Sequence, residues 1–354
     1  MEETHLRYKP ASVYLPAFCS NLKESLQGHI LIVRPSALGD LIVSLPALEA
    51  IRNYFSGAHI EIMGYPAFLE IVKGRFYADT VSRFDHADIA TLFMKNVQLS
   101  EHLVKRFGCM DMIIPFVFDK EQVLTKNLES IGARAIVHYD PFPPSGESIH
   151  ITDYFIKFLD VLGIPDSGKI PKIFLHKKDI LFGNDFIRDK IDNSNKKLIA
   201  IHPGSGSRQK CWPLERFAEL ILWIRKEMDV QVLVVSGPAD CEIVEKLRMK
   251  VKDFIHVDQL PLPNLAAIIK QCNVFIGNDS GITHLAAAVG VHTIAIFGST
   301  DPNVWGPRGG WVKILHKKSD CSPCFPDTRR NCFLQTCLEA VTVEDVIREV
   351  KYFL

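Results

Sequence analysis

Four times along this chain, a short apolar run leads through a loop of small and polar residues into a segment with helical spacing. The four apolar runs are His29–Arg34, Leu198–His202, Val230–Val235 and Val274–Ile276. Such runs suit buried parallel strands better than core helices. Repeated strand, loop and helix units predict α/β domains whose parallel sheets are joined by right-handed crossovers. Ligands bind beyond the carboxyl ends of such strands, where all four loops lie.

The length of 354 residues predicts two domains. Residues 1–27 precede the first convincing strand, and we expect an irregular extension packed on the domain surface. The polar stretch His176–Lys197 is expected to hold the linker. We therefore expect one domain over residues 28–180 and a second over residues 181–354.

Charge and hydropathy exclude several classes of protein. The chain holds 41 Lys and Arg against 41 Asp and Glu, a balance that does not point to nucleic acid as a partner. No apolar run approaches the roughly 20 residues that a membrane-spanning helix needs. The charged N-terminus does not have the pattern of a secretory signal. We therefore expect a soluble, cytoplasmic protein.

The most informative loop is Asn278–Gly281, between an apolar strand and the Ala-rich segment Ile282–Val289. A strand that opens into a helix through Asp-Ser-Gly presents free backbone N–H groups at the positive end of a helix dipole, which suits a phosphate. Asp279 and Ser280 are also good helix caps. The segment alone leaves both interpretations open, and they are compatible.

Nine cysteines are many for a cytoplasmic chain. The last four, Cys321, Cys324, Cys332 and Cys337, are close in sequence. Four thiolates in one short loop suit a tetrahedral metal such as zinc or iron. Reduced thiols and disulfides are the alternatives, because the spacing is shorter than that of common zinc ribbons.

Three stretches resemble a known family. They are ILIVRPSALGDLIVSLPALEAIR (Ile30–Arg52), IAIHPGSGSRQKCWPLERFAEL (Ile199–Leu220) and FIGNDSGITHLAAAVGVHTIAIFGSTDP (Phe275–Pro302). In this order they resemble glycosyltransferase family 9, the ADP-heptose:lipopolysaccharide heptosyltransferases. The resemblance implies a GT-B fold, in which two Rossmann-like domains face each other across a cleft. The first domain would hold the acceptor and the second the nucleotide sugar, and the transfer would invert the anomeric centre without a catalytic metal.

The resemblance assigns catalytic roles to two residues. Asp40 corresponds to the proposed base, which would take the proton of the acceptor hydroxyl. Lys210 corresponds to the lysine whose charge offsets the negative charge of the departing diphosphate. Without the resemblance, Asp40 is equally a helix cap and Lys210 an ordinary loop lysine.

Other matching residues would bind the donor. Ser205, Gly206 and Ser207 fit a phosphate-contacting loop. Ser280 and Gly281 would hold phosphate through their backbone N–H groups, and His284 would donate to a phosphate oxygen. Asp279 would accept from sugar hydroxyls or cap the helix. Glu242 corresponds to the glutamate that binds ribose, and Asp240 competes for that role.

The resemblance therefore predicts transfer of heptose from ADP-heptose to a lipopolysaccharide inner-core acceptor, with peripheral association at the inner face of the inner membrane allowed. One alternative is a heptosyltransferase that modifies a protein acceptor such as an autotransporter, an idea that the cysteine cluster keeps open. Another is an NAD-dependent oxidoreductase, although neither half carries Gly-x-Gly-x-x-Gly. A sugar-nucleotide binding protein without activity is the third.

Overall fold

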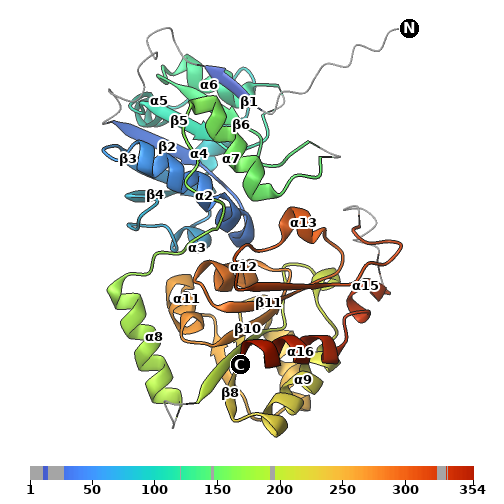
Figure 1. The fold of residues 1–354 in the computed structure, drawn as a ribbon. Coiled ribbons are helices and arrows are strands. Elements are labelled where there is room, and N and C mark those ends of the chain that lie inside the picture. Colours follow the sequence, from blue (N-terminus) through green and yellow to red (C-terminus); the bar gives the residue numbers. More distant parts are fainter. Residues whose placement is uncertain are drawn as a thin grey trace, which may run out of the picture. The chain divides into compact units, whose positions relative to one another are not determined.

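The structure, a computed structural model, describes residues 11–14, 28–119, 121–144, 147–191, 196–324, 332 and 334–354. The chain divides into two compact units. One comprises Met1–Ala37 and Ser44–Lys169, and the other comprises Leu38–Val43 and Ile170–Leu354. Each unit holds a six-stranded sheet covered by helices (Figure 1). The prediction of two α/β domains built on parallel sheets is confirmed, and the fold is GT-B-like.

The sheet of the first unit has the strand order β1-β6-β5-β2-β3-β4. Its strands are β1 (Ala11–Tyr14), β2 (His29–Val33), β3 (His59–Gly64), β4 (Thr80–Arg83), β5 (Met112–Pro115) and β6 (Ile136–Tyr139). The pairs among β2 to β6 are all parallel. Strand β1 pairs antiparallel with β6. Part of the N-terminal extension is therefore an edge strand, whereas we had expected irregular structure; its remainder lies outside the described residues.

Helices cover both faces of this sheet (Figure 1). They are α2 (Leu38–Tyr54), α3 (Pro66–Leu69), α4 (Ala87–Thr91), α5 (Glu101–Gly108), α6 (Val123–Ser130) and α7 (Ile151–Leu162). Leu103 of α5 and Leu124 of α6 pack with Leu31 and Val33 of β2 in one apolar core. Burying such side chains stabilises the fold by about 1.5–3 kcal/mol each.

The second sheet is wholly parallel in the order β12-β11-β10-β7-β8-β9. Its strands are β7 (Lys197–His202), β8 (Val230–Ser236), β9 (Ile255–Asp258), β10 (Val274–Asn278), β11 (His292–Phe297) and β12 (Val312–His316). The four predicted strands correspond to β2, β7, β8 and β10. Because β10 is buried on both faces, each of its five residues is inaccessible to water.

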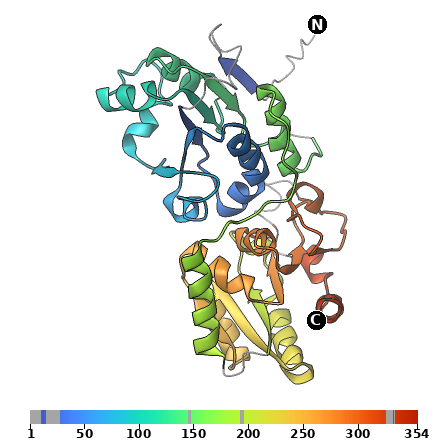
Figure 2. The same ribbon diagram turned by 60° about the vertical axis from the view of Figure 1, so that its left-hand side comes forward.

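The helices of this unit are α8 (Lys177–Lys190), η1 (Arg208–Lys210), α9 (Leu214–Glu227), α10 (Cys241–Lys250), α11 (Leu262–Lys270), α12 (Gly281–Ala288), α13 (Pro302–Trp305), α15 (Thr336–Glu339) and α16 (Val343–Phe353). Helices α9, α10 and α16 share one core with the sheet, as Phe217, Leu247 and Val346 show. Helix α8 lies beside α11 in both views (Figure 1, Figure 2). Pro213 is the N-cap of α9, and Leu214 is the first helical residue.

The polar stretch that we expected to be a linker forms α8. The side chain of Asp179 accepts a hydrogen bond from the backbone N–H of His176 at 2.8 Å, which completes a capping box. Gly183 packs against the backbone of Ala267 in α11. The two units divide at Lys169, ahead of α8, whereas the expected boundary follows residue 180.

Strand order fixes where a ligand would bind in each sheet. From β7 the chain continues to β8 and β9 on one side, and β10 then pairs with the other side of β7. The order therefore reverses between β7 and β10, and in the first unit it reverses between β2 and β5. Ligands of doubly wound sheets collect at the carboxyl ends of the strands at such a point. The loops after β2, β7 and β10 are three of the four loops singled out from the sequence, and the fourth follows β8.

Among the described helices, none combines the length and the apolar character needed to cross a lipid bilayer.

Candidate functional site

The turn between β10 and α12 lies at the reversal point of the second sheet. Ser280 is the N-cap of α12, and its hydroxyl accepts from the backbone N–H of Thr283 at 3.3 Å. The prediction that Asp279 caps this helix is wrong, because its side chain points to other partners. Gly281 is the first helical residue. The positive end of the helix dipole therefore coincides with the predicted phosphate-binding turn.

Asp279 holds the predicted catalytic lysine. Its Oδ2 lies 2.7 Å from Lys210 Nζ and also accepts from the Thr300 hydroxyl. The Asp279 side chain is 7% exposed and that of Lys210 is 23% exposed. The ammonium is thus fixed beside the turn, and about a quarter of the Lys210 side chain remains open to solvent. This partnership differs from the expected role of Asp279 in binding sugar hydroxyls.

Asn278 joins the two loops at the reversal point. Its side chain is fully buried, accepts from the backbone N–H of Trp212 at 2.9 Å, and donates to the carbonyls of Pro203 at 2.8 Å and Gly204 at 3.2 Å. No sequence motif assigned a role to Asn278. The signal was present, since a polar side chain ending a wholly apolar strand needs hydrogen-bond partners.

The β7–α9 loop is shaped by its own hydroxyls. Ser205 Oγ donates to the carbonyl of Asp279 at 2.7 Å, and Ser207 Oγ donates to Gln209 Oε1 at 2.7 Å. A side chain at Gly206 would meet open space. Trp212 is buried and donates through its indole N–H to the carbonyl of Val341 at 2.8 Å. These contacts bring Ser205 and Lys210 to the β10–α12 turn.

Asp40 lies in the first turn of α2, whose N-cap is Ala37. Asp40 is therefore not the helix cap. The segment Leu38–Val43 groups with the second unit. Within that unit, a side chain at Gly281 would come within 2.9 Å of Leu38 Cβ, so the first turns of α2 and α12 touch only because glycine is present.

His284 lies one turn into α12 and is buried, with 6% of its surface exposed. Its Cδ2 is 3.5 Å from the Cβ that a side chain at Gly39 would have. His284 therefore lies beside Gly39, the residue that precedes Asp40. This arrangement places the predicted base of α2 near the predicted phosphate turn.

Asp240 and Glu242 competed for the ribose contact. Asp240 is buried, and its Oδ2 accepts from the backbone N–H of Gly237 at 2.8 Å and lies 3.1 Å from His202 Nε2. Glu242 is 76% exposed and pairs with Lys246 at 2.5 Å. Side-chain hydrogen bonding and charge from Lys246 lower the pKa of Glu242. Of the two carboxylates, only that of Glu242 faces solvent.

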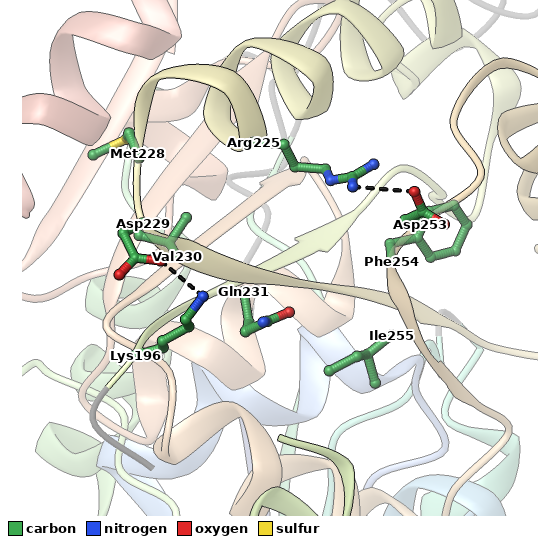
Figure 3. A pocket seen from close by; sticks show the side chains of 9 residues that line it. All are labelled: Lys196, Arg225, Met228, Asp229, Val230, Gln231, Asp253, Phe254 and Ile255. Carbon is green, nitrogen blue, oxygen red and sulfur yellow. Dashed lines mark hydrogen bonds and ion pairs between the residues drawn. The ribbon is translucent and has the colours of Figure 1, made fainter. Parts of the chain in front are cut away.

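A cavity of about 430 Å³ lies at the opposite end of the second sheet (Figure 3). It is lined near the amino ends of β8 and β9 by Lys196, Arg225, Met228, Asp229, Val230, Gln231, Asp253, Phe254 and Ile255. Its charges already pair, Lys196 with Asp229 at 2.8 Å and Arg225 with Asp253 at 3.1 Å. This cavity therefore lacks free charge for an anionic ligand and is not the predicted site.

No disulfide joins the four clustered cysteines, all of which the structure describes. Cys337 is buried, Cys321 is exposed, and Cys324 and Cys332 are half-buried. Burial raises the pKa of the Cys337 thiol, and the other three cysteines add to this effect. In the described part of the chain, no three His, Cys, Asp or Glu side chains converge as metal ligands. A structural zinc or iron at the cysteine cluster stays a prediction.

Known proteins share this architecture. The model of glycosyltransferase family 9 (heptosyltransferase) matches residues 139–334. Lipooligosaccharide heptosyltransferase 2 of Campylobacter jejuni is 25% identical over 92% of this chain and 98% of its own length. A family 9 glycosyltransferase of Veillonella parvula, 21% identical, superposes with a TM-score of 0.77 over 93% of this chain and 98% of its own. The ADP-heptose lipopolysaccharide heptosyltransferase II of E. coli, 15% identical, gives 0.69 over 92% and 98%. Because the family model covers more than half of the sequence, this chain belongs to glycosyltransferase family 9 and is a glycosyltransferase.

Proposed function

We propose that this enzyme transfers heptose from ADP-heptose to the inner core of lipopolysaccharide, with inversion at the anomeric carbon. The observation that carries the proposal is the β10–α12 turn, where the start of a helix and the Lys210 ammonium lie at the reversal point of a doubly wound sheet. A diphosphate suits both groups. The choice of heptose, ADP and lipopolysaccharide follows the similarity to lipooligosaccharide heptosyltransferase 2 of C. jejuni and to the ADP-heptose lipopolysaccharide heptosyltransferase II of E. coli.

The turn would bind the donor through the backbone N–H groups of Ser280 and Gly281, with His284 donating to a phosphate oxygen. The loop residues Ser205, Gly206 and Ser207 would close around the phosphates. Glu242 would accept from the ribose hydroxyls, because its carboxylate faces solvent and that of Asp240 does not.

In the proposed reaction the acceptor oxygen bonds to the anomeric carbon while the bond from that carbon to the diphosphate breaks. Asp40 takes the hydroxyl proton, and the bonding electrons leave with ADP. Negative charge grows on the departing diphosphate, where Lys210 offsets it. Asp279 keeps the ammonium in place through the ion pair. Lys210 supplies this charge in our proposal, which requires no catalytic metal. We place the reaction in the cytoplasm, at the inner face of the inner membrane where the acceptor lies.

The proposal is tested by following ADP release from ADP-heptose with purified enzyme. We expect ADP release with heptose-deficient lipopolysaccharide core, and no UDP release when UDP-glucose replaces ADP-heptose as donor. Release only with an autotransporter polypeptide would favour the protein acceptor instead. No release with any acceptor would contradict heptosyl transfer altogether. Elemental analysis of the same preparation checks the separate prediction of zinc or iron at the cysteine cluster.

A further inference from the structure

A buried chain of hydrogen bonds runs from Asp240 through His202 to Ser280, and the proposed reaction does not use it. His202 is the last residue of β7, Asp240 is the N-cap of α10 and Ser280 is the N-cap of α12. His202 Nε2 lies 3.1 Å from Asp240 Oδ2, and His202 Nδ1 lies 3.3 Å from Ser280 Oγ. His202 and Asp240 are 3% and 6% exposed. An imidazole thus connects a buried carboxylate to the phosphate turn.

The carboxylate end of this chain is fixed. Burial opposes ionisation of Asp240, but the hydrogen bond and charge of His202 and the Gly237 N–H outweigh it, so the pKa of Asp240 lies below its ordinary value. A side chain at Gly204 would come within 1.9 Å of Asp240 Oδ1. The backbone of the β7–α9 loop therefore packs directly on the carboxylate and holds it toward His202.

This geometry assigns the protons when His202 is neutral. Asp240 Oδ2 already accepts from the Gly237 N–H, so the carboxylate is also the acceptor in its bond to the ring, and the Nε2 nitrogen of His202 carries the hydrogen. Nδ1 then has only a lone pair, so the Ser280 hydroxyl donates to it. Ser280 Oγ still accepts from the N–H of Thr283. The single hydrogen of Ser280 is therefore directed at the ring and is not offered to a phosphate.

Protonation of His202 exchanges donor and acceptor in the hydrogen bond between His202 and Ser280. Nδ1–H would then donate to Ser280 Oγ, and the Ser280 hydroxyl hydrogen would be released. It has an internal acceptor at 3.1 Å, the hydroxyl oxygen of Thr283, whose own hydrogen is donated to the carbonyl of Asn278. Both protonation states are thus satisfied without ligand, and a bound anion can select between them.

Other charges around this chain come from each neighbouring element. The charged and titratable residues of the adjoining segments are Arg208 and Lys210 in η1, Asp279 just before the N-cap of α12, and His284 within α12. Lys210 is neutralised by Asp279 at 2.7 Å. Burial and the Asp240 carboxylate raise the pKa of Cys211 to about 11, so that thiol is uncharged. At the end of β8, the Ser236 hydroxyl hydrogen-bonds with His256 at 2.8 Å and with Asp258 at 2.7 Å. His256 therefore belongs to a different hydrogen-bonded group from His202.

We propose that His202 is a positioning residue that takes up one proton when the donor diphosphate binds, and that this proton turns the Ser280 hydroxyl from the imidazole ring to the phosphate. The proton comes from solvent and resides on Nδ1. Asp240 keeps its negative charge and stabilises the imidazolium that forms. The inference rests on the proposed function, because it requires a diphosphate at the β10–α12 turn.

The test is calorimetry of ADP binding in buffers that differ in ionisation enthalpy, which counts the protons exchanged. ADP itself exchanges protons, so the informative quantity is the difference between wild type and His202→Gln. Glutamine can still donate to Asp240 but cannot be protonated. We expect wild type to take up to about one proton more per ADP than His202→Gln. Its affinity should also rise more steeply as pH falls, by up to about tenfold per pH unit.

His292→Gln is the matched control, since this exposed histidine begins β11 in the same sheet and stacks on Phe353 at 4.5 Å. It should keep the wild-type proton count. Nitrogen-15 spectra of wild-type His202 give a check that needs no variant, because ADP should convert the Nε2–H tautomer to the doubly protonated ring.

Equal proton counts in wild type and His202→Gln, or a neutral ring in the ADP complex, would overturn the inference while leaving the proposed function intact. If ADP does not bind at all, both fall together.

Discussion

At the scale of single residues, Asp40 has a role that a conservative substitution isolates. Asp40→Asn keeps the size of the side chain but removes the base, so we expect ADP affinity within about twofold of wild type. Turnover should fall by about 10²–10⁴, the usual contribution of general base catalysis. Steady-state kinetics and calorimetry separate the two effects. Normal turnover at saturating donor with weakened binding would show that Asp40 is a binding residue and not the base.

Asp140 gives a prediction about pH and stability. It follows β6 and is 5% exposed, and burial raises its pKa to about 6. Between about pH 4 and 6 the folded protein keeps a proton on Asp140 that the unfolded chain releases. The stability that this proton gives the folded state is fully present below about pH 4 and is lost as pH rises through 6. Asp140→Asn should therefore raise the free energy of unfolding above pH 6, by roughly 1–3 kcal/mol.

Near pH 4 the same substitution should have little effect. Thermal melts at pH 4.5 and 7.5 measure the difference, and Asp189→Asn, at a side chain that is 69% exposed, serves as the control. An equal shift of Tm at both pH values would contradict the interpretation of Asp140.

At the scale of elements, Asn278 ties β10 to the loop after β7, and its two donated hydrogen bonds cannot be made by aspartate. Asn278→Asp would leave the carbonyls of Pro203 and Gly204 without this donor and would bury a charge. We expect a loss of at least about 3 kcal/mol in unfolding free energy, with weaker ADP binding. Chemical denaturation measures the first effect and calorimetry the second.

Asn273→Asp is a close control, because Asn273 joins the same two strands at their other end. Its Oδ1 accepts from the N–H of Leu198 at 2.8 Å, which an aspartate can also do. We expect a loss below about 1 kcal/mol. Equal losses of unfolding free energy in the two variants would show that the hydrogen bonds donated by Asn278 contribute nothing to stability.

Elements were the part of the structure that the sequence predicted best. Strands β2, β7, β8 and β10 each have an apolar run whose period and length are local properties. Helix α8 was missed because its polar composition hides a capping box and a face that packs on α11. Strand β1 was missed because pairing with β6, more than a hundred residues away, decides its conformation.

The site was predictable in location but not in contacts. Asp279 and Lys210 were both singled out, yet their ion pair joins residues far apart in the chain and no local pattern reveals it. The same applies to His202, which a sequence pattern presents only as the end of a strand. Ser280, and not Asp279, is the N-cap because α12 begins at Gly281.

At the scale of the whole molecule, ligand binding separates a glycosyltransferase from a dinucleotide-dependent oxidoreductase. We expect ADP at about 100 times its Kd to raise the free energy of unfolding by about 2.7 kcal/mol. NAD should cause no shift, because neither strand–helix junction has the glycine spacing of a dinucleotide fingerprint. Differential scanning calorimetry measures both. Stabilisation by NAD with none by ADP would reject the family assignment of the donor.

The antiparallel pairing of β1 with β6 has a practical consequence for recombinant work. A truncated version beginning at Gly28 would retain every predicted motif, yet it would uncover the backbone N–H and C=O groups of β6 that now pair with Ala11–Tyr14. An uncovered strand of this kind is a template for association between molecules. Shortening the chain to its recognisable motifs would therefore yield an aggregation-prone enzyme with an intact catalytic sequence.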